Sequence, residues 1–353
     1  MSAALDKEIR LSFAQRIKGT LPSPLQGLIP ESKAKDAPDF KYNDETIPLA
    51  SQGSQVAQLI RRKGTDEEIL PLFQSIQEEA ATLGLDPNLA WTDIYVTAIC
   101  YVGSKSLSHV LSCIERCKDR LLGIAISSRP ARHQIITSVM SYWEFQPGVG
   151  VNIVDKLLNY SILTPTAVIE WALVDHIERG TILAKSHIYE MIDITMIKVT
   201  NRIQQIVAAI RRPGLAEEQV ATMQDTLERE RLDMQRLFEL IKINLAGVAN
   251  GSVDEMAEAA VDGASGAEDE ALVKQWGQRW TRVFQRRLLV VNSWITEELA
   301  KPIPEVVEVV DDQEVKMVDE KERDPGFDVA RLNPFEEYNG SGEGISAVAD
   351  GID

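Results

Sequence analysis

The sequence from Trp143 to Leu173 holds three patterned runs: Trp143-Glu144-Phe145-Gln146-Pro147, then Val154-Asp155-Lys156-Leu157-Leu158, then Ala167-Val168-Ile169-Glu170-Trp171-Ala172-Leu173. Their apolar residues recur at helical spacing, which predicts helices over about 148–161 and 165–178. Thr164-Pro165 pairs an N-cap residue with proline at the first helical position, and Gly180 is a typical helix end. The short turn between the two helices predicts an antiparallel pair.

Similar helices are predicted on the N-terminal side of this pair. Thr65-Asp66-Glu67-Glu68 is a capping box that opens a helix towards Leu83, in which Pro71 is expected to introduce a kink or a late start. Asp86-Pro87 opens another helix in the way that Thr164-Pro165 does. The remaining predicted helices span 3–18, 55–62, 87–102, 105–125 and 130–145.

The helices become longer after Thr181. Apolar residues at three- and four-residue spacing predict one helix up to residue 210 and another over about 216–245, joined by Arg211-Arg212-Pro213-Gly214. A last helix is expected over about 268–300. Its apolar stripe consists of Trp276, Trp280, Phe284, Leu288, Val291 and Ile295.

These elements predict an all-α fold of stacked antiparallel helix pairs, HEAT-like, with a long helical hairpin at 181–245. Residues 1–52 are interpreted as an N-terminal helix and irregular linker that end a preceding domain. Residues 53–300 form the predicted helical-repeat domain, interrupted by an acidic disordered loop at 247–267, and residues 301–353 form a disordered acidic tail.

The negative charge of the chain is confined to two segments. The formal net charge of the 353 residues is -17. Residues 301–353 carry fifteen acids and five bases, and residues 251–270 carry seven acids and no base, so these two segments account for the whole of it. The neutral remainder lacks the broad basic face of a protein that itself grips nucleic acid.

Composition also limits the class of protein. Three cysteines form no disulfide framework, the N-terminus lacks the apolar core of a signal peptide, and no run of about 18 apolar residues predicts a membrane span. A metal site of His109, Cys113 and Cys117, with Cys100 nearby, is conceivable, but these residues would spread over roughly 12 Å of one helix. We therefore interpret them as core residues and predict no metal and no cofactor.

No other motif predicts catalysis. Gln146 to Val151 resembles a phosphate loop only superficially and is interpreted as a helix–helix turn. Asp311-Asp312 lies in the polar tail, and the histidines His109, His133, His176 and His187 are scattered, so we predict no catalytic residue and leave the partner-binding residues unassigned. The tryptophans (Trp91, Trp143, Trp171, Trp276, Trp280 and Trp294) are interpreted as core, and the basic clusters (Arg61-Arg62-Lys63, Arg211-Arg212 and Arg286-Arg287) as solvated faces or, alternatively, RNA contacts.

Several segments together resemble the C-terminal helical domain of the large subunit of the nuclear cap-binding complex. Lys41-Tyr42-Asn43-Asp44-Glu45 is similar to its Lys-Tyr-Gly-Asp-Glu element, and Gly103 to His109 to its Lys-Ser-Phe-Ser-His segment. Gly64-Thr65-Asp66-Glu67-Glu68-Ile69 resembles its Thr-Asn-Asp-Glu-Ile helix start. The residues Trp143, Pro147, Val154-Asp155-Lys156, Ala167-Val168 and Trp171 follow in the order of the family.

The resemblance implies a fold like the middle domain of initiation factor 4G and a chain that lacks the first two of three such domains. It implies a non-enzymatic scaffold that docks a small subunit with an RNA-recognition fold, which itself holds the 7-methylguanosine cap. Splicing and export factors would be further partners, and no membrane is expected to be one. The expected location is the nucleus, with the cytoplasm as a second location. The alternatives are a general helical-repeat adaptor of another RNA or transport assembly and an all-helical enzyme.

Overall fold

A computed structural model describes residues 15, 16, 18–26, 38–251 and 265–302. Within these ranges the chain forms helices and turns without a β-strand, which confirms the predicted all-α class. The α-helices are α2 (Ser23–Gln26), α3 (Ala50–Arg62), α4 (Asp66–Thr82), α5 (Pro87–Gly103), α6 (Leu107–Arg116), α7 (Lys118–Ser127), α8 (Arg129–Tyr142), α9 (Pro147–Asn159), α10 (Pro165–Glu170), α11 (Ser186–Ile210), α12 (Glu217–Asn250) and α13 (Ser265–Ala300). Three short segments complete the order: 3₁₀-helix η1 (Lys41–Asn43), π-helix η2 (Trp171–Asp175) and 3₁₀-helix η3 (Glu178–Ala184).

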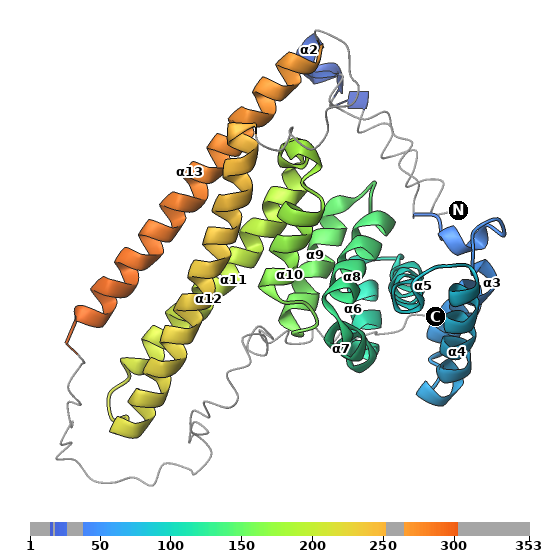
Figure 1. Cartoon of the computed structure of the whole chain (residues 1–353), viewed down its shortest axis with the longest axis horizontal. Coiled ribbons are helices and arrows are strands. Elements are labelled where there is room, and N and C mark those ends of the chain that lie inside the picture. Colours follow the sequence, from blue (N-terminus) through green and yellow to red (C-terminus); the bar gives the residue numbers. More distant parts are fainter. Residues whose placement is uncertain (1–14, 17, 27–37, 252–264, 303–353) are drawn as a thin grey trace, which may run out of the picture.

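The helices stack roughly in chain order, as Figure 1 shows. Helix α3 packs against α4, α5 against α6, α7 against α8, and α8 against α9. The longer helices α11, α12 and α13 form one end of the array, where α11 contacts α9 and α10. This arrangement confirms the predicted stack of antiparallel pairs, since the apolar face of each helix is covered by its neighbours.

Helix α5 is the centre of the first half of the array. It packs against α3, α4, α6 and α8, and nearly all of its residues from Trp91 to Cys100 are buried. The helix ends at Gly103, where an added Cβ would lie 2.4 Å from the Cα of Val110. Glycine is therefore required for the close approach of α5 and α6.

The segment Lys41-Tyr42, which has no helical periodicity, is held against α5 by Asp93. The Asp93 carboxylate accepts hydrogen bonds from the Tyr42 hydroxyl at 2.7 Å and the Ser138 hydroxyl at 2.7 Å, and pairs with Lys41. Burial would raise the pKa of Asp93, but the ion pair and these hydrogen bonds outweigh burial and hold the pKa below its usual value. Phe40 and Tyr42 are buried in the main core, so the segment 38–52 packs with the helical array.

The predicted long hairpin is built from α11 and α12, and α13 packs along both helices. The positions of α11 that follow three- and four-residue spacing from Ile188 to Ile210 are buried. Arg287 of α13 pairs with Asp193 of α11 at 2.6 Å, and the Arg211 guanidinium donates to the carbonyls of Glu298, Lys301 and Pro302. These contacts fix α13 against the N-terminal half and the C-terminal end of α11.

The single helix predicted over 105–125 is wrong, because the chain bends at Cys117 into α6 and α7. The bend turns two apolar faces to different neighbours. Val110, Cys113 and Ile114 of α6 face the core on the side of α5, whereas Leu121 and Ile124 of α7 are buried on the side of α8. Packing therefore breaks a helix that the local sequence would have continued.

The helix predicted over 165–178 also differs from the structure. It is α-helical only to Glu170, continues as the π-helix η2, and is followed by η3, in which Arg179 and Gly180 have positive φ angles. A Cβ on Gly180 would lie 2.5 Å from Val248 and 2.6 Å from Val273, so α12 and α13 press directly on this turn. Helix α11 consequently begins at Ser186 rather than at Thr181.

Two further boundaries are corrected. Helix α4 begins at Asp66 and runs through Pro71, which excludes the late start. Helix α12 continues to Asn250, beyond the predicted loop start at 247, because Val248 is buried and Gly251 ends the helix with φ 74°. Residues 252–264 and 303–353, and with them Asp311-Asp312, lie outside the described residues.

Candidate partner-docking groove

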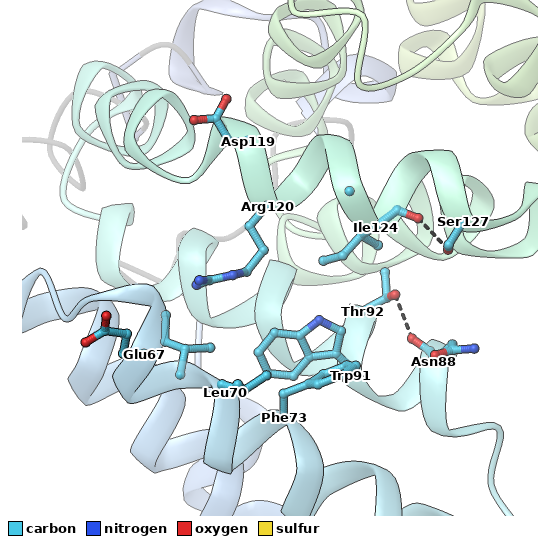
Figure 2. Close-up of a pocket in the computed structure, with 12 residues that line it drawn as sticks. Glu67, Leu70, Phe73, Asn88, Trp91, Thr92, Asp119, Arg120, Ile124 and Ser127 are labelled. Atoms are coloured by element: carbon cyan, nitrogen blue, oxygen red, sulfur yellow. Dashed lines mark hydrogen bonds between the residues drawn. The ribbon is translucent and has the colours of Figure 1, made fainter.

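Helices α4, α5 and α7 enclose an open groove of about 620 Å³, which Figure 2 shows with its lining side chains. Leu70 and Phe73 come from α4, Trp91 from α5 and Ile124 from α7. The groove therefore lies between three helices, of which α4 and α5 follow each other in the chain and α7 is separated from α5 by α6. Most of its surface is apolar, although polar and charged side chains also line it.

Local sequence chemistry fixes the helices that form this groove. The Thr65 amide donates to the Glu68 carboxylate at 2.9 Å, which anchors the start of α4. The Asp86 carboxylate accepts from the amides of Asn88 and Leu89 at 2.9 and 3.0 Å, and Pro87 occupies the first turn of α5. The predicted N-caps at Thr65 and Asp86 thus determine where the walls of the groove begin.

Phe73 and Trp91 form the floor of the groove and begin an aromatic row that continues to the buried Tyr95. The ring of Phe73 meets Trp91 edge-on at 5.1 Å between centroids, and Trp91 stacks on Tyr95 at 5.1 Å. The Arg120 guanidinium lies 5.6 Å from the Tyr95 centroid and extends the row to α7. Such packed rings form a rigid floor, because each ring restricts the rotation of the next.

The groove presents apolar surface to solvent. Leu70 is 54% exposed, and Gly123 leaves open space where a side chain would be. The hydroxyl groups of Thr92 and Ser127 are already bonded to the carbonyls of Asn88 and Ile124, each at 2.7 Å, as Figure 2 shows. A groove of this kind suits apolar side chains of a protein partner, with Glu67 and Asp119 at its polar rim.

The cysteines and His109 do not come together as a metal site. Cys100 and Cys113 are buried, Cys117 lies at the bend between α6 and α7, and His109 is exposed. Burial raises the pKa of the Cys100 thiol to about 12, which disfavours the thiolate that binds metal. Across 38–251 and the other described ranges, no group of histidine, cysteine and carboxylate side chains has metal-binding geometry.

The surroundings of His133 have no counterpart among the sequence-based predictions. Its ring bonds to Asp175 through Nδ1 and lies 3.5 Å from Glu170 through Nε2, while Arg129 pairs with Glu170 at 2.9 Å. The four side chains link α8 to the last residue of α10 and to the π-helical turn η2. His176 bonds to the Trp171 carbonyl at 2.8 Å. Both histidines therefore stabilise the turn.

The other sequence candidates occupy structural positions. The segment from Gln146 to Val151, interpreted as a helix–helix turn, is a turn only at Gln146, the N-cap residue, because Pro147 to Val151 already belong to α9. Of the tryptophans, Trp91, Trp143, Trp171 and Trp280 are buried, whereas Trp276 and Trp294 pack half-buried against the core. The basic pairs at 211 and 286 contribute Arg211 and Arg287 to contacts between helices. In the described part of the chain, no helix has the length and apolar character needed to cross a bilayer.

Comparison with known proteins places this fold in a family. The family described as MIF4G like matches residues 40–293. The nuclear cap-binding protein subunit 1 of Schizosaccharomyces pombe is 28% identical over 221 residues, which are 62% of this chain and 26% of that protein. The nuclear cap-binding protein subunit 1 of Xenopus tropicalis is 25% identical, and subunit 1-A of Xenopus laevis is 24% identical. Both matches extend over 268 residues, which are 67% of this chain and 33% of each relative. The chain spans about a quarter to a third of the length of these relatives, and it belongs to the MIF4G-like family.

Proposed function

We propose that this chain is part of the non-enzymatic helical scaffold of a nuclear cap-binding complex, where it docks a small subunit with an RNA-recognition fold. The small subunit would hold the 7-methylguanosine cap, and the complex would serve splicing and export of capped RNA in the nucleus. The observation that carries the proposal is the family match over 40–293 together with relatives named nuclear cap-binding protein subunit 1.

The groove between α4, α5 and α7 supplies a place for such docking. Its aromatic floor is held in place by the stacking of Trp91 on Tyr95. Burial of the exposed Leu70 side chain by a partner would contribute favourable binding free energy. A partner that folds or closes against a rigid surface loses less conformational freedom than one that orders both sides at once. The scaffold would thereby favour the cap-binding conformation of the small subunit.

Gly123 allows a direct test of the groove. We expect Gly123→Leu to fill the groove and weaken binding of the small subunit at least tenfold, because excluding a hot-spot anchor costs at least about 2 kcal/mol and tenfold corresponds to about 1.4 kcal/mol. The substitution should leave the chain folded, since the new Cβ meets no atom within 4 Å and leucine has a higher helix propensity than glycine. Titration calorimetry with the small subunit from the same organism measures the change.

Gly148→Leu is the matched control. Gly148 is also helical and exposed, a Cβ added to it would meet no atom within 4 Å, and it lies on α9 away from the groove. Binding of the small subunit should be unchanged in this variant. Equal affinity of wild type and Gly123→Leu would remove the groove from the docking surface, whereas no binding by wild type would contradict docking by this chain.

A further inference from the structure

A second groove, of about 510 Å³, has a different character. It lies where α3, α5 and α6 come together, and four cationic side chains line it: Arg61, Lys63, Lys105 and Arg116. Among the residues that the structure describes, no carboxylate lines it. Because the chain outside residues 251–270 and 301–353 is formally neutral, this groove is a local concentration of positive charge.

Two acids that are close in sequence to these cations pair with residues outside the groove. Glu68 pairs with Arg62 at 2.7 Å, and Glu115 lies 3.9 Å from Lys156. Arg61 lies over the Tyr101 ring, 5.4 Å from its centroid, and Arg116 donates to the sulfur of Cys113 at 3.3 Å. Neither of these contacts cancels a positive charge, so the groove keeps four fixed charges facing solvent.

Helix dipoles account for only part of this arrangement. Arg61 and Arg116 lie in the last turns of α3 and α6, and Lys105 follows the end of α5, where cations are favourable by a few tenths of a kcal/mol. The dipoles explain one cation at each helix end. They do not explain Lys63, which lies at the rim of the same groove. Its backbone is in the left-handed conformation (φ 61°), where glycine would cost less conformational free energy than lysine.

The lining also distinguishes between classes of anionic partner. Leu70, Leu107 and the other exposed large apolar residues do not line this groove. Its apolar lining consists of the half-buried Tyr101 and Val102, so it offers a protein partner fewer apolar anchors than the groove between α4, α5 and α7. The Tyr101 ring is stacked on Phe40 at 4.4 Å and covered by Arg61, which leaves no free face for a nucleobase. The groove therefore offers charge without base stacking.

We propose that this groove binds the phosphate backbone of single-stranded RNA, without preference for sequence. The proposal rests on the proposed function in one respect, that the RNA is the segment following the cap. Phosphate binding by lysine and arginine requires neither apolar anchors nor aromatic faces, and releases counterions from the strand.

The test compares two variants that each remove two positive charges from the full chain. Lys63→Gln with Lys105→Gln changes the groove, whereas Arg236→Gln with Lys242→Gln changes the exposed surface of α12. Fluorescence anisotropy with an uncapped, unstructured RNA of about 20 nucleotides, longer than one typical binding site, gives the dissociation constant of each protein at several salt concentrations. Thermal unfolding confirms that both variants are folded.

We expect the groove variant to bind the RNA about 25-fold more weakly at roughly 0.1 M salt, and the magnitude of its salt slope to fall by roughly 1.4, because each phosphate contact on a single strand contributes about 0.7. The α12 variant should bind within about twofold of wild type. Absence of RNA binding by wild type, or equal losses in both variants, would overturn the proposal.

A second arm separates this proposal from the proposed function. The assay above needs neither the cap nor the small subunit, so it succeeds or fails independently of cap-complex assembly. In the complex with the small subunit, the groove variant should keep the affinity of wild type for the cap dinucleotide and lose the gain in affinity that the same RNA provides when it is capped. Equal affinity of both complexes for the long capped RNA would overturn the assignment to the RNA that follows the cap.

Discussion

Trp171→Ala is expected to lower the free energy of unfolding by about 3–5 kcal/mol, the range for removing a large buried aromatic side chain. Trp171 is 5% exposed, and its indole Nε1 donates to the Thr137 hydroxyl at 2.8 Å, which joins η2 to α8. Its ring also lies 4.4 Å from that of His176. Alanine would leave a cavity at the turn on which α12 packs. Urea unfolding followed by circular dichroism measures the loss.

Phe145→Ala is the control for this substitution. Phe145 is also a large aromatic residue, but it is 80% exposed on the turn before α9. Its removal should change stability by no more than about 0.5 kcal/mol. A loss below about 1 kcal/mol for Trp171→Ala would contradict the buried position of that ring.

Asp93→Ala is expected to lower the free energy of unfolding by about 3 kcal/mol at neutral pH, because the Tyr42 and Ser138 hydroxyls lose their acceptor and Lys41 its partner. The pKa of Asp93 is lowered in the folded state, so its charge contributes stability above the unfolded pKa of about 3.9. That contribution disappears as the pH falls through the lowered folded value. The difference between wild type and variant should therefore shrink in acid.

Urea midpoints between about pH 2 and pH 7 measure this dependence. Asp233→Ala is the matched control, since Asp233 pairs with Arg236 on the exposed face of α12 and should change stability by roughly 0.5 kcal/mol or less. A constant difference between wild type and Asp93→Ala over the whole range would contradict the charged role of Asp93. The portion that remains in acid reports packing and neutral hydrogen bonds.

The parts of the fold that depend on local chemistry could be predicted from the sequence. The N-cap side chains of Asp86 and Thr164 accept the expected hydrogen bonds from backbone amides, and the apolar stripe of α11 is buried along its whole length. Caps and long stripes are recognisable because the interacting residues lie within one helix. The resemblance drawn from ordered short motifs is confirmed by the family match.

Features that depend on contacts between distant residues could not be predicted. The bend at Cys117 and the π-helix at Trp171–Asp175 follow from packing on neighbouring helices, which helical periodicity does not encode. Lys41 and Asp93 are 52 residues apart, so nothing local marks their ion pair. The same holds for His133 and Asp175.

The two grooves could not be predicted for a related reason. Leu70 and Phe73 continue the apolar pattern of α4, and only the position of α7 leaves Leu70 uncovered. The three basic clusters also look alike in sequence, yet Arg211 and Arg287 are used between helices while Arg61 and Lys63 line a groove. The one local signal is the helix end at Lys63-Gly64, where a cation precedes the glycine.

Retention on a cap-analogue resin tests the scaffold role most directly. The full chain is applied alone and then together with the family's small subunit from the same organism. The scaffold role predicts that the chain is retained only with the small subunit and is released by free cap analogue. Retention of the chain alone, or its passage through the resin while the small subunit is retained, would contradict that role.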